Sequence, residues 1–479
     1  MSSADLRGLL PLLILGGAPV VILLVIAFAR SHRLTCALTV AALCLCGAAI
    51  PLAASGAPRE VTALLLIDFY SLFYLGLLIA AGLAVTLLSY GYLAGRSDQP
   101  EEYYVLLLLA TLGSAILVAS RHFGAFFLGL EILSISLYAL IAYPRAWAHG
   151  IEAGIKYLIL AAGSAAFLLF GMALLYAETG SLAFARLAAA PALAGVHALV
   201  LLAGVGLLMV GIGFKVAVVP FHLWTPDVYE GAPAPVAGFV ATISKGAMFA
   251  LLLRLFLPLH LRLHGSLFGA FLAIAVASMI VGNLLALFQT NLKRILAYSS
   301  IAHLGYLLVA FLAGGQWALT AATFYLVAYF VTTLAAFGVV SVLSDGARDR
   351  DTLDEYRGLF WEHPWLAGVM TVALLSLAGI PLTAGFIGKF YLVAAGAANA
   401  LWVGVFGLVL TSAIGLFYYL RIVVAMATPP GAGALPIRVP TVTWAGSLAL
   451  TVLALLLLGL GIYPAPLIQM IHGAVGSLG

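Results

Sequence analysis

The stretch from Gly211 to Val236, "GIGFKVAVVPFHLWTPDVYEGAPAPV", decides the fold class of this chain. It carries Lys215 inside an apolar run and Pro220 shortly afterwards, before a second apolar run begins. Proline removes a backbone donor and clashes with the preceding turn, so it interrupts a helix. The stretch therefore predicts a helix that stops beside a lysine, in apolar surroundings where an ammonium group is costly to place.

The composition indicates apolar surroundings for the whole chain. Hydrophobic residues make up 65% of the 479 residues, and charged residues only 8%. Apolar runs of about 18 or more residues mark helices that cross a hydrocarbon core about 30 Å thick. These runs are too long for a transmembrane β-barrel and lack its apolar-polar alternation. We therefore expect an all-α polytopic membrane protein with about 14 transmembrane helices. The predicted spans are 8–29, 34–54, 65–90, 103–120, 123–143, 151–177, 197–231, 233–259, 266–289, 292–313, 317–343, 363–395, 401–427 and 441–463.

The polar remainder of the chain is short. Its longest polar stretch, from Ser344 to Pro364, is smaller than an independently folding domain. Most lysines and arginines between the spans lie in the loops after odd-numbered spans, and such loops stay on the cytoplasmic side. Both termini are therefore expected on the outer side. No cluster of basic residues indicates nucleic-acid binding.

The motifs for bound cofactors are missing from the sequence. Cys36, Cys44 and Cys46 all lie in the second predicted span, without the spacing or histidine partners of a metal or iron–sulfur site. No G-x-G-x-x-G segment follows a strand, and the sequence contains no P-loop. We expect no metal or nucleotide chemistry on this chain.

Five ionisable residues lie deep inside predicted spans: Glu131, Lys215, Lys245, His303 and Lys389. An ionised side chain near the centre of a bilayer costs about 2.5 to 3.5 kcal/mol on insertion scales. A structural ion pair is the alternative for the acid and the lysines, and a hydrogen-bonded core residue is the alternative for the histidine. One acid cannot neutralise three lysines, however. Desolvation favours the neutral amine, so a buried lysine is suited to proton exchange.

Four other charged residues have simpler interpretations. Lys156 is expected to pair with Glu152 one turn earlier, or to reach the interface. Asp68 is interpreted as an interfacial anchor, and Arg254 as a side chain that reaches from its span to the interface.

Two predicted spans are too long to be single straight helices. The run 197–231 would measure about 52 Å and the run 363–395 about 50 Å at 1.5 Å per residue. Each contains a proline near a lysine: Pro220 follows Lys215, and Pro381 precedes Lys389. A break with a polar residue beside it, present once in each half, is typical of the paired repeats of ion carriers.

Three segments carry a resemblance to a known family: "VPFHLWTPDVYEGAPAPV" (219–236), "ATISKGAMFALLLRLF" (241–256) and "ALFQTNLKRILAYSSIAHLGY" (286–306). They closely resemble subunit N of bacterial respiratory complex I, the proton-pumping NADH:quinone oxidoreductase. Relatives of that family are subunits L and M and the membrane subunits of cation/proton antiporters. Lysine at position 389 favours the N type, because M-type chains carry glutamate there.

The resemblance implies a fold of fourteen helices with two inverted five-helix repeats. Helices 1 to 3 would occupy 1–95, the first repeat (helices 4 to 8) 96–260, the second repeat (helices 9 to 13) 261–430 and helix 14 431–479. Helices 7 and 12 would be broken, at Pro220 and Pro381. Glu131, Lys215, Lys245, His303 and Lys389 match the polar positions of the family's proton relay.

The resemblance also implies the setting of the chain. FMN, the iron–sulfur clusters and the quinone site would lie in partner subunits, with subunits M and K as neighbours in a hetero-oligomer surrounded by the lipids of the bacterial inner membrane. Both termini would be periplasmic. The expected activity is proton translocation driven by quinone reduction elsewhere. Two alternatives stay open: a subunit of a multisubunit Na⁺/H⁺ antiporter, and a structural spacer whose polar residues hold helices together.

Overall fold

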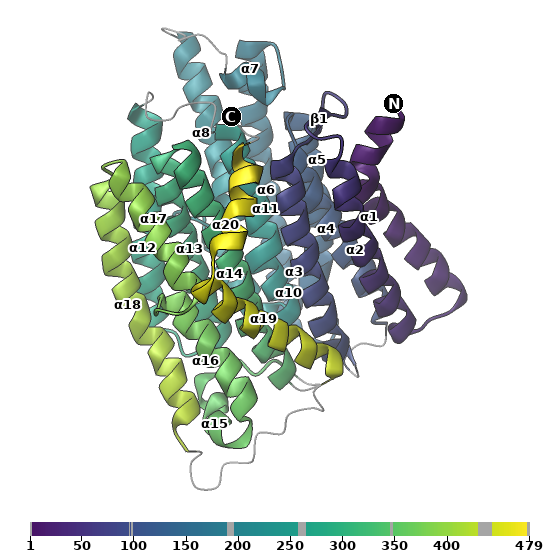
Figure 1. Ribbon diagram of the computed structural model, residues 1–479, viewed down its shortest axis with the longest axis vertical. Coiled ribbons are helices and arrows are strands. Elements are labelled where there is room, and N and C mark those ends of the chain that lie inside the picture. Colours follow the sequence, from purple (N-terminus) through teal and green to yellow (C-terminus); the bar gives the residue numbers. More distant parts are fainter. Residues whose placement is uncertain are drawn as a thin grey trace.

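A computed structural model of the chain describes residues 2–94, 96, 99–188, 196–256, 265–344, 348–429 and 443–476. Nearly all of these residues are helical, and the helices run roughly along the long axis of the molecule (Figure 1). The expected segment boundaries at 260 and 430 lie outside the described residues, as does residue 95.

Three helices and a small hairpin form the N-terminal part. They are α1 (Ser3–Phe28), α2 (His32–Ala54), α3 (Phe69–Leu93), β1 (Arg59–Glu60) and β2 (Leu66–Ile67), the two strands pairing antiparallel. Asp68 caps α3, because its side chain accepts the backbone N–H of Ser71 at 2.8 Å. Helices α1 and α2 form the outer edge of the molecule, with side chains such as Leu24 exposed.

The central part of the chain begins with long helices and ends with short ones. They are α4 (Glu101–Ala119), α5 (Phe123–Ile141), α6 (Ala148–Thr179), α7 (Phe184–Ala188), α8 (Val196–Val216), α9 (Trp224–Gly231), α10 (Ala234–Phe239), the π-helix η1 (Val240–Ser244) and α11 (Lys245–Phe256). The segment from Ala234 to Phe256 is a span whose most apolar window is completely buried. A π-helical turn inside such a span often marks a functional site.

The last part has long helices at both ends and shorter elements between them, followed by one short C-terminal helix. Its elements are α12 (Gly265–Leu287), α13 (Leu292–Ala313), α14 (Gly315–Leu343), the 3₁₀ turn η4 (Leu353–Tyr356), α15 (Leu359–Glu362), α16 (Pro364–Ala378), α17 (Ala384–Ala398), α18 (Trp402–Ala427), α19 (Trp444–Ile462) and α20 (Ala465–Val475). Helices α13 and α14 lie in the interior, with 94% of their most apolar windows buried. Helix α20, which was not predicted from the sequence, is short and amphipathic.

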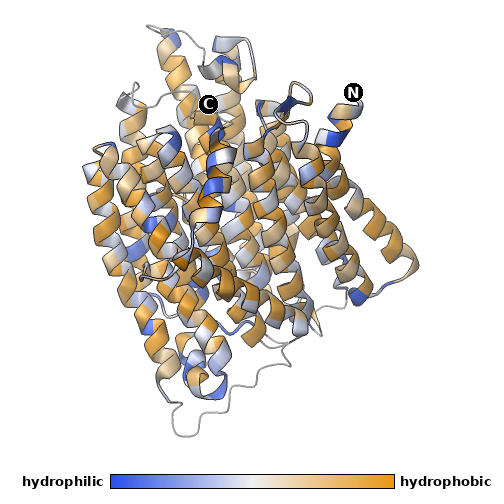
Figure 2. Cartoon of the chain, viewed as in Figure 1, coloured by the Kyte–Doolittle hydropathy of each residue, from blue (hydrophilic) through white to orange (hydrophobic). Residues whose placement is uncertain are grey.

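The described residues contain 13 helices that are long and apolar enough to cross a membrane. Helices α16 and α17 are each shorter and are separated by the segment around Pro381, so together they account for the predicted run 363–395. The all-helical polytopic fold predicted from the apolar runs is therefore confirmed. Figure 2 shows hydrophobic residues along most of the outer helices and hydrophilic residues gathered mainly toward the two ends.

The segment around Pro220 separates α8 from α9. Helix α8 ends at Val216, and α9 begins at Trp224. Ala217 adopts a left-handed conformation with φ of 61°, which turns the chain away from the helix axis. At the end of α8, the carbonyl of Phe214 accepts the backbone N–H of Ala217 at 3.0 Å and the indole N–H of Trp224 at 2.9 Å.

The segment around Pro381 separates α16 from α17 in a different way. Gly379 ends α16 with φ of 85°, and its N–H bonds to the carbonyl of Leu375 at 2.9 Å. A Cβ atom on Gly379 would stand 2.8 Å from Cδ of Lys389, so both the backbone angle and the close approach require glycine. The carbonyls at the end of α16 thus face the aliphatic stem and the ammonium group of Lys389.

Candidate functional site

Lys215 lies in the last turn of α8, just before the helix stops, and its side chain is only 2% exposed. Its Nζ donates to the hydroxyl of Ser134 on α5 at 3.0 Å and to the hydroxyl of Tyr157 on α6 at 2.9 Å. Nζ also lies 5.4 Å from the centre of the Tyr157 ring. The ammonium group is therefore held by neutral oxygens and an aromatic face.

Glu131 lies one turn before Ser134 on α5 and is half-buried. It makes no ion pair within 4 Å with Lys215, although both residues belong to the part of the chain that the structure describes. Both line a cavity of about 10 Å³, together with Ser134 and Ser164. That is about the smallest volume that holds one water molecule. Ser134 therefore makes the direct contact with Lys215, and Glu131 lies across the same small cavity.

Lys245 begins α11 directly after the π-helical turn, and it is 1% exposed. Its Nζ donates to the hydroxyl of Ser300 on α13 at 2.7 Å. The rings of Trp224 and Tyr229 lie 5.7 and 5.1 Å from the same nitrogen. Lys245 thus occupies an aromatic cage that has one hydroxyl acceptor among its described contacts.

His303 lies on α13 three residues after Ser300 and is 3% exposed. Its Nδ1 is 2.9 Å from the hydroxyl of Tyr325, and its Nε2 is 3.2 Å from the hydroxyl of Tyr419. A neutral imidazole donates through one nitrogen and accepts through the other. The two tyrosine hydroxyls can both donate and accept, so this arrangement suits either tautomer.

Lys389 lies on α17 and faces the end of α16. Its Nζ donates to the carbonyls of Leu377 and Ala378 at 2.7 and 3.0 Å, and to the hydroxyl of Ser412 on α18 at 2.6 Å. The last carbonyls of a helix have no intrahelical partner and carry the negative end of its dipole. The helix break therefore provides the acceptors for this ammonium group.

Aromatic and hydroxyl side chains connect the three lysines and His303. Trp224 lies 4.8 Å from Tyr157, the partner of Lys215, and also contacts Lys245. Tyr329 bonds to Ser300 at 2.8 Å and lies 5.5 Å from the His303 ring. The Tyr306 ring lies 5.3 Å from His303 and 5.3 Å from the Nζ of Lys389. The described contacts therefore form a polar and aromatic chain from Lys215 to Lys389.

Sequence reasoning missed the hydroxyl partners and one histidine. Ser134, Tyr157, Ser300 and Ser412 bond the lysines, yet serine and tyrosine occur in almost every span and carry no distinguishing spacing. His222 lies in the break after α8 and is 7% exposed, and its Nδ1 has no hydrogen-bond partner in the described part of the chain. In the sequence, only the position of His222 close to Pro220, in the stretch 211–236, could have pointed to it.

The remaining charged residues separate into two groups. The pair of Lys156 with Glu152 is confirmed at 2.8 Å, and Lys156 also binds Asp227 at 2.9 Å. Two interpretations are wrong: Asp68 is not an interfacial anchor, and the side chain of Arg254 does not reach to the interface. Arg254 donates to both carboxylate oxygens of Asp68, at 2.9 and 2.8 Å, and both side chains are buried. The two residues lock α3 to α11.

No group of three or more His, Cys, Asp or Glu residues suitable for a metal ion occurs within the described ranges. Cys36, Cys44 and Cys46 are free thiols on α2. The chemistry that the five residues offer is the transfer of protons between amine, imidazole, carboxyl and hydroxyl groups.

Comparison with known proteins gives consistent matches. The family model of the NADH:quinone oxidoreductase/Mrp antiporter transmembrane region matches residues 120–415. NADH-quinone oxidoreductase subunit N of Ectopseudomonas mendocina is 49% identical, covering 99% of this chain and 97% of that protein. Subunit N of Nitrosospira multiformis is 54% identical, again covering 99% and 97%.

Solved structures agree with the sequence matches. A chain of respiratory complex I from Thermus thermophilus superposes with a TM-score of 0.81 at 34% identity, covering 97% of this chain and 99% of that chain. A chain of the Mrp complex from Dietzia shares the fold, with a TM-score of 0.87 at 21% identity, covering 100% and 98%. The chain therefore belongs to the subunit N branch of the NADH:quinone oxidoreductase/Mrp antiporter membrane family.

Proposed function

We propose that this chain translocates protons as an antiporter-like membrane subunit of an NADH:quinone oxidoreductase. The observation that carries the proposal is the nature of the acceptors around its deepest lysines. Lys215, Lys245 and Lys389 donate to hydroxyl and carbonyl oxygens, and none of them has a carboxylate within 4 Å among the described residues. Such an amine can lose its proton without leaving a buried carboxylate unpaired.

The structural ion pairs of the same chain provide a contrast. Arg254 with Asp68, and Lys293 with Asp349, are buried pairs between opposite charges. Removing the charge of one partner in such a pair leaves the other charge buried and uncompensated, at a cost of about 3 to 5 kcal/mol. The three relay lysines lack this penalty, which argues against a purely structural spacer.

In the proposed route, an ionised Glu131 favours the protonated form of Lys215. Two unit charges about 4 Å apart interact by about 4 kcal/mol at an effective dielectric of 20, and this value is an upper bound because Glu131 lies farther away. When the influence of Glu131 weakens, Lys215 releases its proton toward Lys245. His303 and Lys389 carry it onward to the outer side. Quinone reduction in other subunits supplies the energy.

The proposal includes a setting for the chain. We place it in the bacterial inner membrane between subunits M and K, with FMN, iron–sulfur clusters and quinone bound by partner subunits. Both termini lie at the same end of the molecule (Figure 1), which supports their common placement on the periplasmic side. We also propose that α4 to α11 and α12 to α18 are the two inverted repeats, since each contains one broken helix with a lysine.

The experiment uses the variants Lys215→Ala and Glu131→Gln in the assembled complex, with proton pumping and NADH oxidation measured in vesicles. Both variants are expected to lose pumping while the complex still purifies with all its subunits. Near-normal pumping by an intact complex would contradict the assigned roles.

The second candidate function is a subunit of a multisubunit Na⁺/H⁺ antiporter, supported by the shared fold of the Mrp chain. The full-length similarity to subunit N proteins favours the oxidoreductase. Purification of the chain with its native partners separates the two. Flavin and iron–sulfur subunits in the complex support the oxidoreductase, whereas sodium-dependent transport by a complex that lacks them supports the antiporter.

A further inference from the structure

Asn283 is a buried amide in an otherwise apolar helix. It lies near the end of α12, a helix without charged residues, and it is 1% exposed. Helix α12 faces largely outward, since only 39% of its most apolar window is buried. A buried amide in such a helix is costly unless its nitrogen and its oxygen have partners. The partners of Asn283 therefore indicate what the residue does.

Both polar atoms of the Asn283 side chain have partners. The nitrogen donates to the carbonyl of Met279 in its own helix at 2.8 Å and to the hydroxyl of Tyr306 on α13 at 2.9 Å. The oxygen accepts the hydroxyl of Tyr418 on α18 at 3.0 Å. A backbone carbonyl can only accept, so the contact with Met279 fixes which end of the amide is the nitrogen. The amide thus directs one donor at Tyr306 and joins three helices at one place.

Glycines leave room for this amide between the helices. Gly282 precedes Asn283, and a Cβ atom on it would stand 2.7 Å from a backbone nitrogen of α13. Gly305 precedes Tyr306, and a Cβ atom on it would stand 2.8 Å from a backbone oxygen of α12. On α18, a Cβ atom on Gly415 would stand 3.0 Å from the amide oxygen itself. The three helices therefore approach closely around Asn283, as small residues allow in membrane proteins.

Tyr306 connects this amide to the lysine and the histidine of the relay. Its ring is buried and lies 5.3 Å from the Nζ of Lys389 and 5.3 Å from the ring of His303. A cation within about 6 Å of a ring centre is attracted to the negative face of the ring. The ring of Tyr306 thus contacts the imidazole and also attracts the charged form of Lys389.

The amide is the short contact of the Tyr306 hydroxyl. The hydroxyl of Thr411 on α18 lies 3.5 Å from the same oxygen, but its own proton goes to the carbonyl of Gly407 at 2.6 Å. A threonine hydroxyl has one proton, so Thr411 cannot donate to Tyr306 at the same time. Asn283 is therefore the described donor that fixes the hydroxyl of Tyr306, and through it the angle of the ring.

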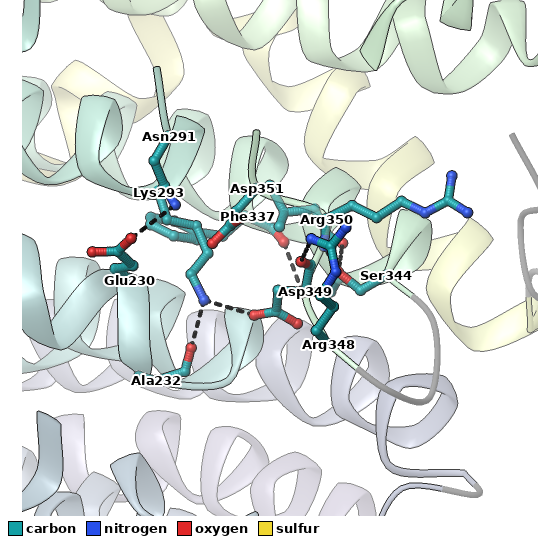
Figure 3. Close-up of polar contacts among 12 residues, drawn as sticks. Glu230, Ala232, Asn291, Lys293, Phe337, Ser344, Arg348, Asp349, Arg350 and Asp351 are labelled. Atoms are coloured by element: carbon teal, nitrogen blue, oxygen red, sulfur yellow. Dashed lines mark hydrogen bonds and ion pairs between the residues drawn. The ribbon is translucent and has the colours of Figure 1, made fainter. Parts of the chain in front are cut away.

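The elements around the ring are held independently of Asn283. Figure 3 shows Lys293, at the start of α13, between the carboxylate of Asp349 and the carbonyl of Ala232, bonded at 2.7 and 2.8 Å. The Nζ of Lys389 bonds to two carbonyls at the end of α16 and to a hydroxyl of α18. Removal of the amide is therefore expected to release the ring of Tyr306 and to leave α13 and Lys389 in place.

We propose that Asn283 is a positioning residue of the relay, which fixes the ring of Tyr306 against Lys389 and His303. The proposal rests on the proposed function. In the step concerned, the imidazolium form of His303 gives up a proton and becomes neutral, and the neutral amine of Lys389 takes up that proton and becomes the ammonium group. The fixed ring keeps the geometry of this step, since a displacement of about 1 Å can slow a reaction by a factor of about 10².

The main test uses Asn283→Leu and Tyr306→Phe in the assembled complex reconstituted in vesicles. Asn283→Leu removes the donor to the Tyr306 hydroxyl, whereas Tyr306→Phe removes the hydroxyl and keeps a ring of similar volume. We expect the pumping rate per assembled complex to fall about tenfold in both variants, because a ring that is free to tilt no longer holds the geometry. Tyr103→Phe is the matched control, since it removes a buried tyrosine hydroxyl that bonds to Ser89 at 2.8 Å. Its pumping rate is expected to equal that of the wild type.

The double variant Asn283→Leu/Tyr306→Phe separates positioning from a merely structural role. If the amide acts through the hydroxyl of Tyr306, the second change adds nothing, and the double variant pumps like Asn283→Leu alone. Two residues that support the fold independently would instead give losses that multiply. Multiplied losses, or a fall in the amount of assembled complex with a normal rate per complex, would overturn the positioning role.

The outcomes separate the two proposals. Lys389→Met tests the role of Lys389 in the proposed function, and wild-type pumping by this variant would contradict that role. If Lys389→Met stops pumping while Asn283→Leu and Tyr306→Phe pump like the wild type, the positioning role is wrong and the proposed function stands. Loss of pumping in all three, with Tyr103→Phe unaffected and no further loss in the double variant, supports both.

Discussion

The ammonium group of Lys389 lies 2.7 Å from the carbonyl oxygen of Leu377, a residue on the other side of a helix break. The carbonyls of Leu377 and Ala378 have no helical partner, because α16 stops at Ala378. The break in the helix therefore leaves unpaired carbonyl groups, with their partial negative charge, inside the membrane next to Lys389. The break and the lysine form one site.

Replacing Lys389 by Met tests this site. The change removes the donor for two carbonyls and for Ser412, and we expect proton output from the assembled complex to be lost while NADH oxidation in the presence of an uncoupler is retained in part. Both rates are measured on the same vesicles. Full proton output by Lys389→Met would remove Lys389 from the route and leave Lys245 and His303 as its outer end.

Ser134→Ala tests whether a hydroxyl links Glu131 to Lys215. The variant leaves Lys215 with Tyr157 as its one remaining described acceptor, so the buried ammonium form loses a hydrogen bond worth about 1.5 to 3 kcal/mol. We expect pumping to fall about tenfold or more, on the conversion of 1.4 kcal/mol per factor of ten. The measurement is the initial rate of proton uptake by vesicles.

The control for Ser134→Ala lies half a turn away on the same helix. Ser136 is buried as well, but its hydroxyl bonds to the carbonyl of Ile132 in its own helix, at 2.7 Å. Ser136→Ala should therefore leave pumping unchanged. Equal losses in both variants would show that α5 tolerates no serine replacement, and the specific role of Ser134 would be wrong.

The fold and the lysines were predictable for one physical reason. Long apolar runs can be buried only in lipid or in a protein core, and a charge inside such a run is too costly to be accidental. Lys215, Lys245 and Lys389 therefore stand out in the sequence. Pro220 and Pro381 stand out as well, because proline cannot continue a helix.

The partners of these lysines were not predictable from the sequence. Serine and tyrosine residues cost little free energy inside an apolar helix, so they do not stand out there as a buried charge does. A serine bonds easily to its own backbone, so neither Ser134 nor Ser300 differs in sequence from the many serines that point elsewhere. The pair of Asp68 with Arg254 joins residues 186 positions apart. Each of the two lies near a span end, where an interfacial role is the better guess from sequence alone.

Breaking the Asp68–Arg254 ion pair is expected to lower the stability of the protein without a specific loss of proton transfer. Arg254→Met leaves the fully buried carboxylate of Asp68 uncompensated, at a cost of about 3 to 5 kcal/mol. The midpoint temperature at which the purified complex dissociates should fall clearly. Proton uptake per NADH oxidised should stay normal in the fraction that is assembled.

The double variant Arg254→Met/Asp68→Asn checks the cause of that loss. It removes both charges and keeps an amide that can still cap α3, so the midpoint temperature should recover in part. A double variant less stable than Arg254→Met would show that Asp68 acts on its own and that the ion pair is not the source of the effect.

Gly379→Ala is expected to disturb the site around Lys389 through the backbone. Gly379 has φ of 85°, where a residue with a Cβ atom pays about 1 to 2 kcal/mol, and its new Cβ would stand 2.8 Å from Cδ of Lys389. The lysine stem must then move, which pulls Nζ away from the carbonyls of Leu377 and Ala378. Gly368, on the same helix α16, has open space at its Cβ position, so Gly368→Ala should leave pumping unchanged and slightly favour the helix. Both variants are compared at equal amounts of assembled complex. If pumping falls in Gly379→Ala and not in Gly368→Ala, the position of Lys389 against the end of α16 controls proton transfer. Equal pumping in the two variants would contradict that role.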